Sequence, residues 1–184
     1  MRRLPNLLSI ARGALAPFIG AAILKDNYER ALWLTFIAGW TDCLDGLLAR
    51  RLHVESRFGA YADPVADKIL LVTVFVCLGV TGAAPVWFVA LVLGRDVLIL
   101  AMAAAALLFT EVRKFPPSIW GKLSTVVQLV TAVGMMTGRA GPIVWWMTAA
   151  AAVTTALSGV HYLWQGCIRP ARSRRASTEA ARPR

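Results

Sequence analysis

Four aspartates stand close together in a chain that is otherwise basic and apolar. Asp42 and Asp45 are three residues apart, and Asp63 and Asp67 are four apart, so on helices each pair shares one face. Two carboxylates about 4 Å apart repel by roughly 4 kcal/mol even at an effective dielectric constant near 20. The cluster therefore requires neutralisation by protons, by basic side chains or by metal ions.

Charge count alone leaves all three forms of neutralisation open, and geometry favours the metal. Protonation would make the cluster a proton relay, and Arg50, Arg57 and Lys68 are the nearby cations. Clustered carboxylate oxygens, however, suit Mg²⁺, Mn²⁺ or Ca²⁺. Aspartate pairs on two facing helices can share two ions about 3.5–4 Å apart, the usual arrangement for phosphoryl transfer.

Small residues beside the first aspartate pair predict room for a substrate. Gly46 and Ala49 lie on the same helical face as Asp42 and Asp45, and Arg50 follows directly. Small residues also allow close helix packing in membranes. Their position among carboxylates, next to an arginine that suits phosphate, favours a ligand pocket.

The composition predicts a polytopic all-α membrane protein. Of 184 residues, 58% are hydrophobic and 16% charged, and a membrane-spanning helix needs about 20 apolar residues. We expect one membrane domain, residues 1–166, with Pro64 in the first turn of its third span, and a basic tail, residues 167–184, that is disordered or lies on the membrane surface. The six expected spans are 5–24, 31–51, 62–82, 85–110, 120–138 and 142–166.

The basic residues predict the orientation of these spans. With six spans, both termini, the second-to-third connection and the fourth-to-fifth connection share one side, which carries most of the Arg and Lys residues outside the spans. The positive-inside rule places this side, and the aspartates with it, in the cytoplasm. The net charge of +10 is thereby explained by topology and by anionic lipid, without a nucleic-acid partner.

The aspartate stretch resembles the signature of a known family. The pattern D-x-x-D-G-x-x-A-R, eight residues, then G-x-x-x-D-x-x-x-D, from Asp42 to Asp67, resembles that of the CDP-alcohol phosphatidyltransferases without a departure. PNLLSIAR is similar to the family's first-helix entry, with Ser9 where Thr is usual. DPVADKIL is typical of its phosphatidylglycerophosphate and cardiolipin synthase branch.

The resemblance implies a reaction and a role for each matching position. A homodimer in a bacterial-type inner membrane would transfer a phosphatidyl group from CDP-diacylglycerol to an acceptor hydroxyl and release CMP, at the cytoplasmic face. Two Mg²⁺ or Mn²⁺ ions would bind Asp42, Asp45, Asp63 and Asp67, with Asp67 also the general base. The head group of CDP-diacylglycerol would be held by Gly46, Ala49, Arg50, Gly59, Asn6, Ser9 and Arg12.

The acceptor is indicated by the fourth apolar run, GRDVLILAMAAAAL. Arg95 and Lys122 could form a cationic pocket for an acceptor phosphate, although Arg95 and Asp96 could equally form a salt bridge. Phosphatidylglycerophosphate synthases tend to carry Arg-Glu here and a second Arg where this chain has Ala103. Cardiolipin synthases of the eukaryotic type tend to carry Arg-Asp-Val, so the resemblance favours phosphatidylglycerol over glycerol 3-phosphate as acceptor.

Two other classes of protein share some of these features. An intramembrane prenyltransferase also uses aspartate-rich motifs and Mg²⁺, but resembles a longer chain whose motifs lie far apart. A cation carrier would place its carboxylates near the bilayer midplane, whereas these four cluster toward one face.

Overall fold

In the part of the chain that the structure describes, six helices follow the six apolar runs and confirm the all-α fold class. This computed structural model describes residues 4–52, 57–109, 119–137 and 141–180, and it describes side chains within 11–41, 65–102, 104, 121–137 and 141–164. The helices are α1 Leu4–Leu24, α2 Tyr28–Leu52, α3 Arg57–Val80, α4 Val86–Phe109, α5 Ile119–Met136 and α6 Pro142–Ala180.

α3 and α6 extend furthest beyond the expected spans. α3 begins at Arg57, so Pro64 lies inside the helix and not in its first turn as the sequence suggested. Packing against a neighbouring helix compensates for an interior proline, and α1 packs along much of α3. α6 continues to Ala180, beyond the expected end of the last span at residue 166; alanine and arginine in this segment favour helix.

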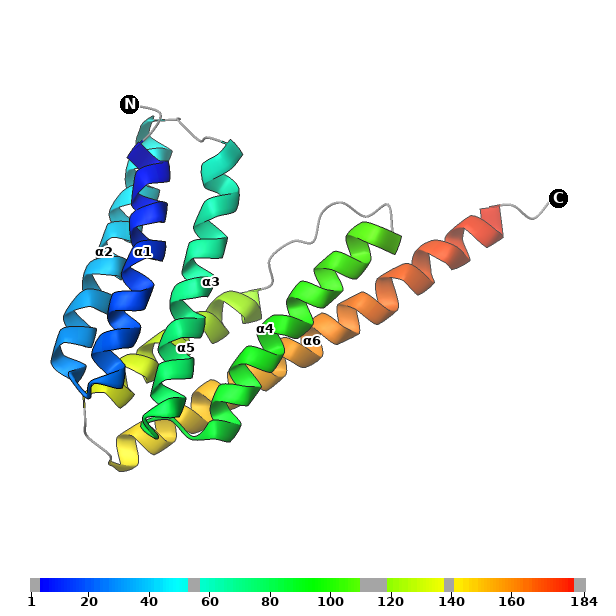
Figure 1. Ribbon diagram of the computed structural model, residues 1–184. Coiled ribbons are helices and arrows are strands. Elements are labelled where there is room, and N and C mark those ends of the chain that lie inside the picture. The colour runs from blue at the N-terminus through cyan, green and yellow to red at the C-terminus, as the bar shows by residue number, and fades with distance from the viewer. Residues whose placement is uncertain (1–3, 53–56, 110–118, 138–140, 181–184) are drawn as a thin grey trace.

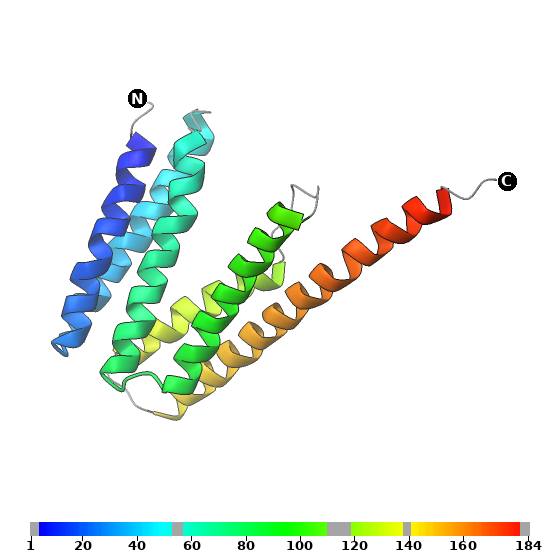
Figure 2. The ribbon, with the colours of Figure 1, turned by 45° about the vertical axis from the view of Figure 1, so that its right-hand side comes forward.

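The chain runs back and forth between two ends of the molecule (Figure 1). The start of α1, the end of α2 and the start of α3 lie at the upper end of the view, and the turns between α1 and α2 and between α3 and α4 lie at the lower end. α1 packs against both α2 and α3, while α4 lies beside α6 in both views (Figure 2). α5 contacts α2, α3 and α6, and so connects the two groups of helices.

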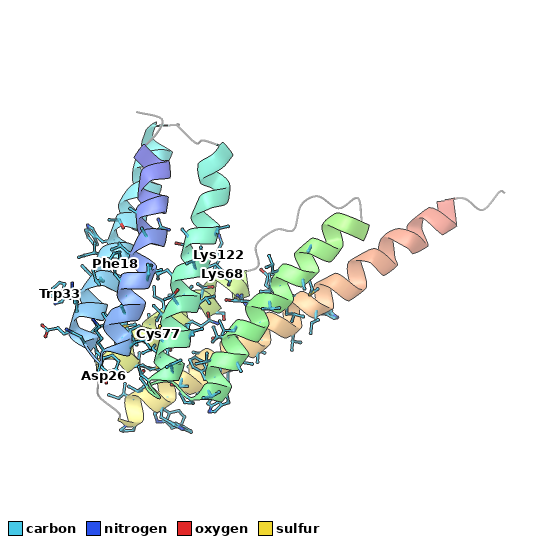
Figure 3. All side chains as sticks on the ribbon, in the orientation of Figure 1. Phe18, Asp26, Trp33, Lys68, Cys77 and Lys122 are labelled. Carbon is cyan, nitrogen blue, oxygen red and sulfur yellow. The ribbon has the colours of Figure 1, made fainter. Side chains whose placement is uncertain are left out.

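Polar side chains lie inside the bundle, and many apolar side chains lie outside. Gln128 of α5 donates from Nε2 to Thr155 Oγ1 of α6 at 2.8 Å and to Ser124 Oγ at 3.2 Å, and all three residues are buried. By contrast, Leu100 is 72% exposed and Trp33, which points away from α2 in Figure 3, is 61% exposed. Large exposed apolar side chains on several helices are typical of a surface that contacts a membrane or a partner.

One stretch of the described residues is both long and apolar enough to cross a bilayer. It is Pro142–Trp164 in α6. Shorter apolar helical stretches are Ala11–Leu24 in α1 and Gly121–Met136 in α5.

A close contact between α1 and α3 yields a stability prediction. A Cβ at Gly20 would lie 2.9 Å from Thr73 Cγ2 and 3.1 Å from Cys77 Sγ, whereas a Cβ at Gly13 of the same helix would meet only Ala66 Cβ at 3.9 Å. Both Gly→Ala changes gain the same helix propensity, so their difference reports the contact. We expect Gly20→Ala to be about 1–3 kcal/mol less stable than Gly13→Ala, measured by thermal unfolding in detergent. Equal midpoints for the two variants would contradict this packing.

Candidate functional site

The structure joins two predicted site residues that lie 55 positions apart. Arg12 of α1, whose side chain is 3% exposed, forms an ion pair and hydrogen bond from Nη1 to Asp67 Oδ1 of α3. The Asp67 side chain is 49% exposed. A buried guanidinium thus holds a carboxylate whose side chain is about half exposed, a charge-assisted contact of the strong kind.

The backbone brings the other aspartates to the same level of the bundle. Asp42 lies ten residues before the end of α2 at Leu52, and Asp67 lies ten residues after the start of α3 at Arg57, which corresponds to about 15 Å from the shared end for both. Asp63 lies one turn nearer to that end than Asp67.

Helical register also places the aspartates on the inner faces of α2 and α3. Ala31, Thr35 and Ala38 are buried along α2, and Asp42 and Asp45 continue this row at spacings of four and three residues.

On α3, Asp63 precedes the buried Ala66 by three residues and Leu70 by seven, so it continues the row that these two form. The positions of all four aspartates thus lie on inward faces of α2 and α3, within about one helical turn of each other along the bundle.

Several predicted ligands lie where the structure describes no side chains. They are Asn6, Ser9, Asp42, Asp45, Gly46, Ala49, Arg50, Gly59 and Asp63. Their places on α1, α2 and α3 are those of the backbone, and their roles stay predictions.

The donor chemistry of the cluster fits divalent cations. Four aspartates at these helical positions would supply hard oxygen ligands of the kind that Mg²⁺ and Mn²⁺ prefer. Arg12, the cation on Asp67 in this structure, shows that this carboxylate position accepts positive charge.

A second charged cluster lies beside the first and involves the residue next to Asp67. Lys68 Nζ lies 2.5 Å from Asp96 Oδ1, and Arg95 Nη1 donates to the same oxygen at 2.9 Å. Arg95 and Asp96 are buried, whereas the Lys68 side chain is 44% exposed. The ion pair of Arg95 with Asp96, one of the two roles expected from the sequence, is therefore present.

Arg95 also connects α4 to α5 and α6. Its Nη2 donates to Ser158 Oγ at 2.9 Å and to the Gly121 carbonyl oxygen at 3.4 Å. A Cβ at Gly121 would lie 3.2 Å from that Nη2 and 2.9 Å from the Tyr162 hydroxyl, so only glycine leaves the guanidinium this space. Lys122, the next residue on α5, is exposed (Figure 3). An acceptor pocket at Arg95 and Lys122 stays a prediction.

Sequence reasoning missed two features of this region. Lys68 was considered only as a counter-ion for the aspartate cluster, whereas it pairs with Asp96 of α4. Its place in the sequence, directly after Asp67, does not indicate a partner on another helix. Thr35 was overlooked because a threonine in an apolar run is common. Its spacing of four residues from Gly39 and seven from Asp42 was the available signal.

Comparison with known proteins identifies the family. A family model described as CDP-alcohol phosphatidyltransferase matches residues 2–158. The chain belongs to this family. Membership confirms the resemblance seen in the aspartate motif and places the CDP-alcohol phosphatidyltransferase chain among transferases of phospholipid synthesis.

The CDP-alcohol phosphatidyltransferase chain is similar to named proteins from animals and plants. It is 31% identical to a probable cardiolipin synthase (CMP-forming) of Drosophila melanogaster over 85% of this chain and 56% of that protein. It is 30% identical to cardiolipin synthase (CMP-forming) of Homo sapiens over 86% and 61%. It is 40% identical to a chloroplastic CDP-diacylglycerol--glycerol-3-phosphate 3-phosphatidyltransferase 1 of Oryza sativa over 54% and 30%. The chain thus spans less than two thirds of the length of these relatives.

Proposed function

We propose that this protein transfers a phosphatidyl group from CDP-diacylglycerol to phosphatidylglycerol, releasing CMP and forming cardiolipin. The observation that carries the proposal is the Arg12–Asp67 pair at the level of the other three aspartates, within a chain of this family. The favoured acceptor rests on Arg95-Asp96-Val97 and Ala103 and on the similarity to cardiolipin synthases. The rice relative supports glycerol 3-phosphate as the second candidate acceptor.

In this proposal the four aspartates bind metal, and Asp67 is also the general base. Asp42, Asp45, Asp63 and Asp67 hold two Mg²⁺ or Mn²⁺ ions, which when bound supply Lewis-acid neutralisation of the donor diphosphate. Asp67 accepts the proton of the acceptor hydroxyl, whose oxygen forms a bond to the lipid-side phosphorus as the bond to the CMP oxygen breaks. Arg12 keeps the Asp67 carboxylate in place, because its buried guanidinium cannot turn to solvent.

The remaining substrate contacts follow the family pattern. Gly46, Ala49, Arg50 and Gly59, with Asn6 and Ser9 of α1, bind the CDP head group at the positions that the motif assigns. Arg95 and Lys122 attract the acceptor phosphate.

We also propose that all six helices lie in a membrane. Exposed apolar side chains on α2, α4 and α6 support this, as do the buried hydroxyl and amide groups between α5 and α6. The active site then opens at the basic face, which is the cytoplasmic face of a bacterial inner membrane. The active form is proposed to be a homodimer, which size-exclusion chromatography with light scattering in detergent would test. Family membership favours this transferase over a prenyltransferase or a cation carrier.

The deciding experiment is a reconstituted assay. Purified protein in detergent is incubated with CDP-diacylglycerol and Mg²⁺ or Mn²⁺, together with either phosphatidylglycerol or glycerol 3-phosphate. Release of CMP with cardiolipin as product supports the favoured acceptor, and phosphatidylglycerophosphate as product supports the second. Absence of both lipid products would overturn both acceptor assignments, and activity in excess EDTA would overturn the metal proposal.

A further inference from the structure

A buried hydroxyl on α2 has no partner within the described part of the protein. Thr35 is 6% exposed, and its Oγ1 makes no hydrogen bond. Other buried hydroxyls are bonded: Thr131 Oγ1 donates to the Val127 carbonyl oxygen at 2.7 Å, and Thr155 Oγ1 to that of Ala151 at 2.6 Å. Because buried polar groups are nearly always hydrogen-bonded, the Thr35 hydroxyl indicates a ligand atom that completes it.

The unpartnered hydroxyl faces a cavity that reaches the candidate active site. This cavity, of about 210 Å³, lies among α1, α2, α3 and α5, and Thr35 lines it together with Arg12, Asp67 and Leu129. Gly39, one turn along α2 from Thr35, lines it as well.

A larger groove continues from the same residues to the outer surface. Thr35, Gly39 and Leu129 also line a space of about 620 Å³ between α2 and α5, whose other walls include Phe36 and Val133. The walls are apolar along most of their length, with Glu29 at the far end. From Gly39 to Glu29 the groove follows ten residues of α2, or about 15 Å.

The order of chemistry along this path matches an amphiphile. The charged Arg12 and Asp67 stand at one end, the unbonded Thr35 hydroxyl follows, and an apolar groove open to the outside comes last. A fatty-acyl ester has the same order of charged head, ester carbonyl and hydrocarbon chain. The volume of the groove lies within the range of ligand pockets, about 300–1,000 Å³.

We propose that the groove between α2 and α5 binds one acyl chain of CDP-diacylglycerol, with the Thr35 hydroxyl donating to the ester carbonyl oxygen of that chain. The donor lipid is assigned because the groove runs along α2, where Asp42 and Asp45 lie three and six residues beyond Gly39. A chain in this groove belongs to the molecule whose diphosphate lies at those aspartates. This inference rests on the proposed transferase function.

Gly39 keeps the passage between cavity and groove open. A Cβ at Gly39 would meet no heavy atom within 4 Å, so a larger side chain fits the fold and fills the passage. Gly94 of α4 likewise has no atom within 4 Å of a Cβ and lines neither space. Gly39→Leu therefore tests the groove, and Gly94→Leu is its matched control.

The first test compares donors of different chain length. Gly39→Leu should lower kcat/KM for dipalmitoyl CDP-diacylglycerol about tenfold or more relative to the dihexanoyl form, because the long chain no longer passes. Gly94→Leu should keep the wild-type ratio. Thr35→Val should raise KM for the donor about five- to tenfold, the effect of one lost hydrogen bond, while its unfolding temperature without lipid stays equal to or above that of the wild type. An unchanged chain-length ratio in Gly39→Leu, or a less stable Thr35→Val, would overturn the proposal.

The second test needs no catalysis and so separates this proposal from the proposed function. CDP-diacylglycerol with a diazirine on one acyl chain is photolysed with the protein in detergent, and adducts are mapped by mass spectrometry. We expect adducts within residues 32–39 and 129–133 that unlabelled CDP-diacylglycerol removes, that Gly39→Leu loses and that Gly94→Leu retains. If unlabelled CDP-diacylglycerol removes these adducts but the protein releases no CMP, the groove proposal is supported and the transferase function is refuted. Adducts only on other helices would refute the groove.

Discussion

Asp67→Asn is expected to reduce CMP release by about 10²–10⁴-fold while the protein stays folded. A general base contributes a factor of this size, and the change also removes one charged oxygen from the proposed metal site. The fold should persist because the Asp67 side chain is 49% exposed, and an asparagine oxygen still accepts a hydrogen bond from Arg12. The readouts are CMP release with the preferred acceptor and thermal unfolding in detergent.

The chain offers a matched control for this substitution. Asp26 lies in the turn between α1 and α2, at the other end of the bundle, with a positive φ of 53°. Asparagine tolerates that conformation. The Tyr28 hydroxyl donates to Asp26 Oδ1 at 3.1 Å, and the side-chain oxygen of asparagine can accept the same hydrogen bond. Asp26→Asn should therefore keep wild-type activity. Asp67→Asn with more than about a tenth of wild-type activity would refute the assigned role of Asp67.

The helices were predictable from the sequence because each of them follows a long apolar run. The ends of the helices were less predictable. Pro64 suggested the start of a helix, but α3 begins at Arg57, and packing of α1 on α3 supports it. α6 passes from an apolar to a basic composition and continues past Gly166 and Pro170 to Ala180, an end that these two residues did not predict.

The aspartate site was predictable as a motif but not as a set of contacts. Spacing along one helix fixes which residues share a face, so the pairs at Asp42 and Asp45 and at Asp63 and Asp67 follow from helical periodicity. The Arg12–Asp67 pair joins α1 to α3 across 55 positions, and helical periodicity carries no information on which face of one helix meets another. Thr35 was missed for the same reason, since its importance comes from a cavity formed by four helices.

The Lys68–Asp96–Arg95 cluster predicts the largest effect on stability. In Asp96→Leu, the buried Arg95 guanidinium keeps Ser158 and the Gly121 carbonyl as partners but loses its counter-ion. Removing one partner of a buried ion pair costs about 3–5 kcal/mol, whereas replacing both partners by apolar residues is often neutral. The variant should therefore unfold at a much lower temperature in detergent, and Arg95→Met/Asp96→Leu should recover most of the loss.

The effect of replacing Lys68 tests whether the contacts of this cluster depend on one another. Its side chain is 44% exposed, so Lys68→Met should cost no more than about 1 kcal/mol, as an exposed ion pair does. If Arg95 served the acceptor alone, Arg95→Met would raise the KM for the acceptor and leave the unfolding temperature unchanged. Because Asp96 pairs with both Arg95 and Lys68, the residue next to Asp67, we expect Arg95→Met to change both the KM for the acceptor and the unfolding temperature. Double-mutant cycles should give a larger coupling energy between Arg95 and Asp96 than between Lys68 and Asp96.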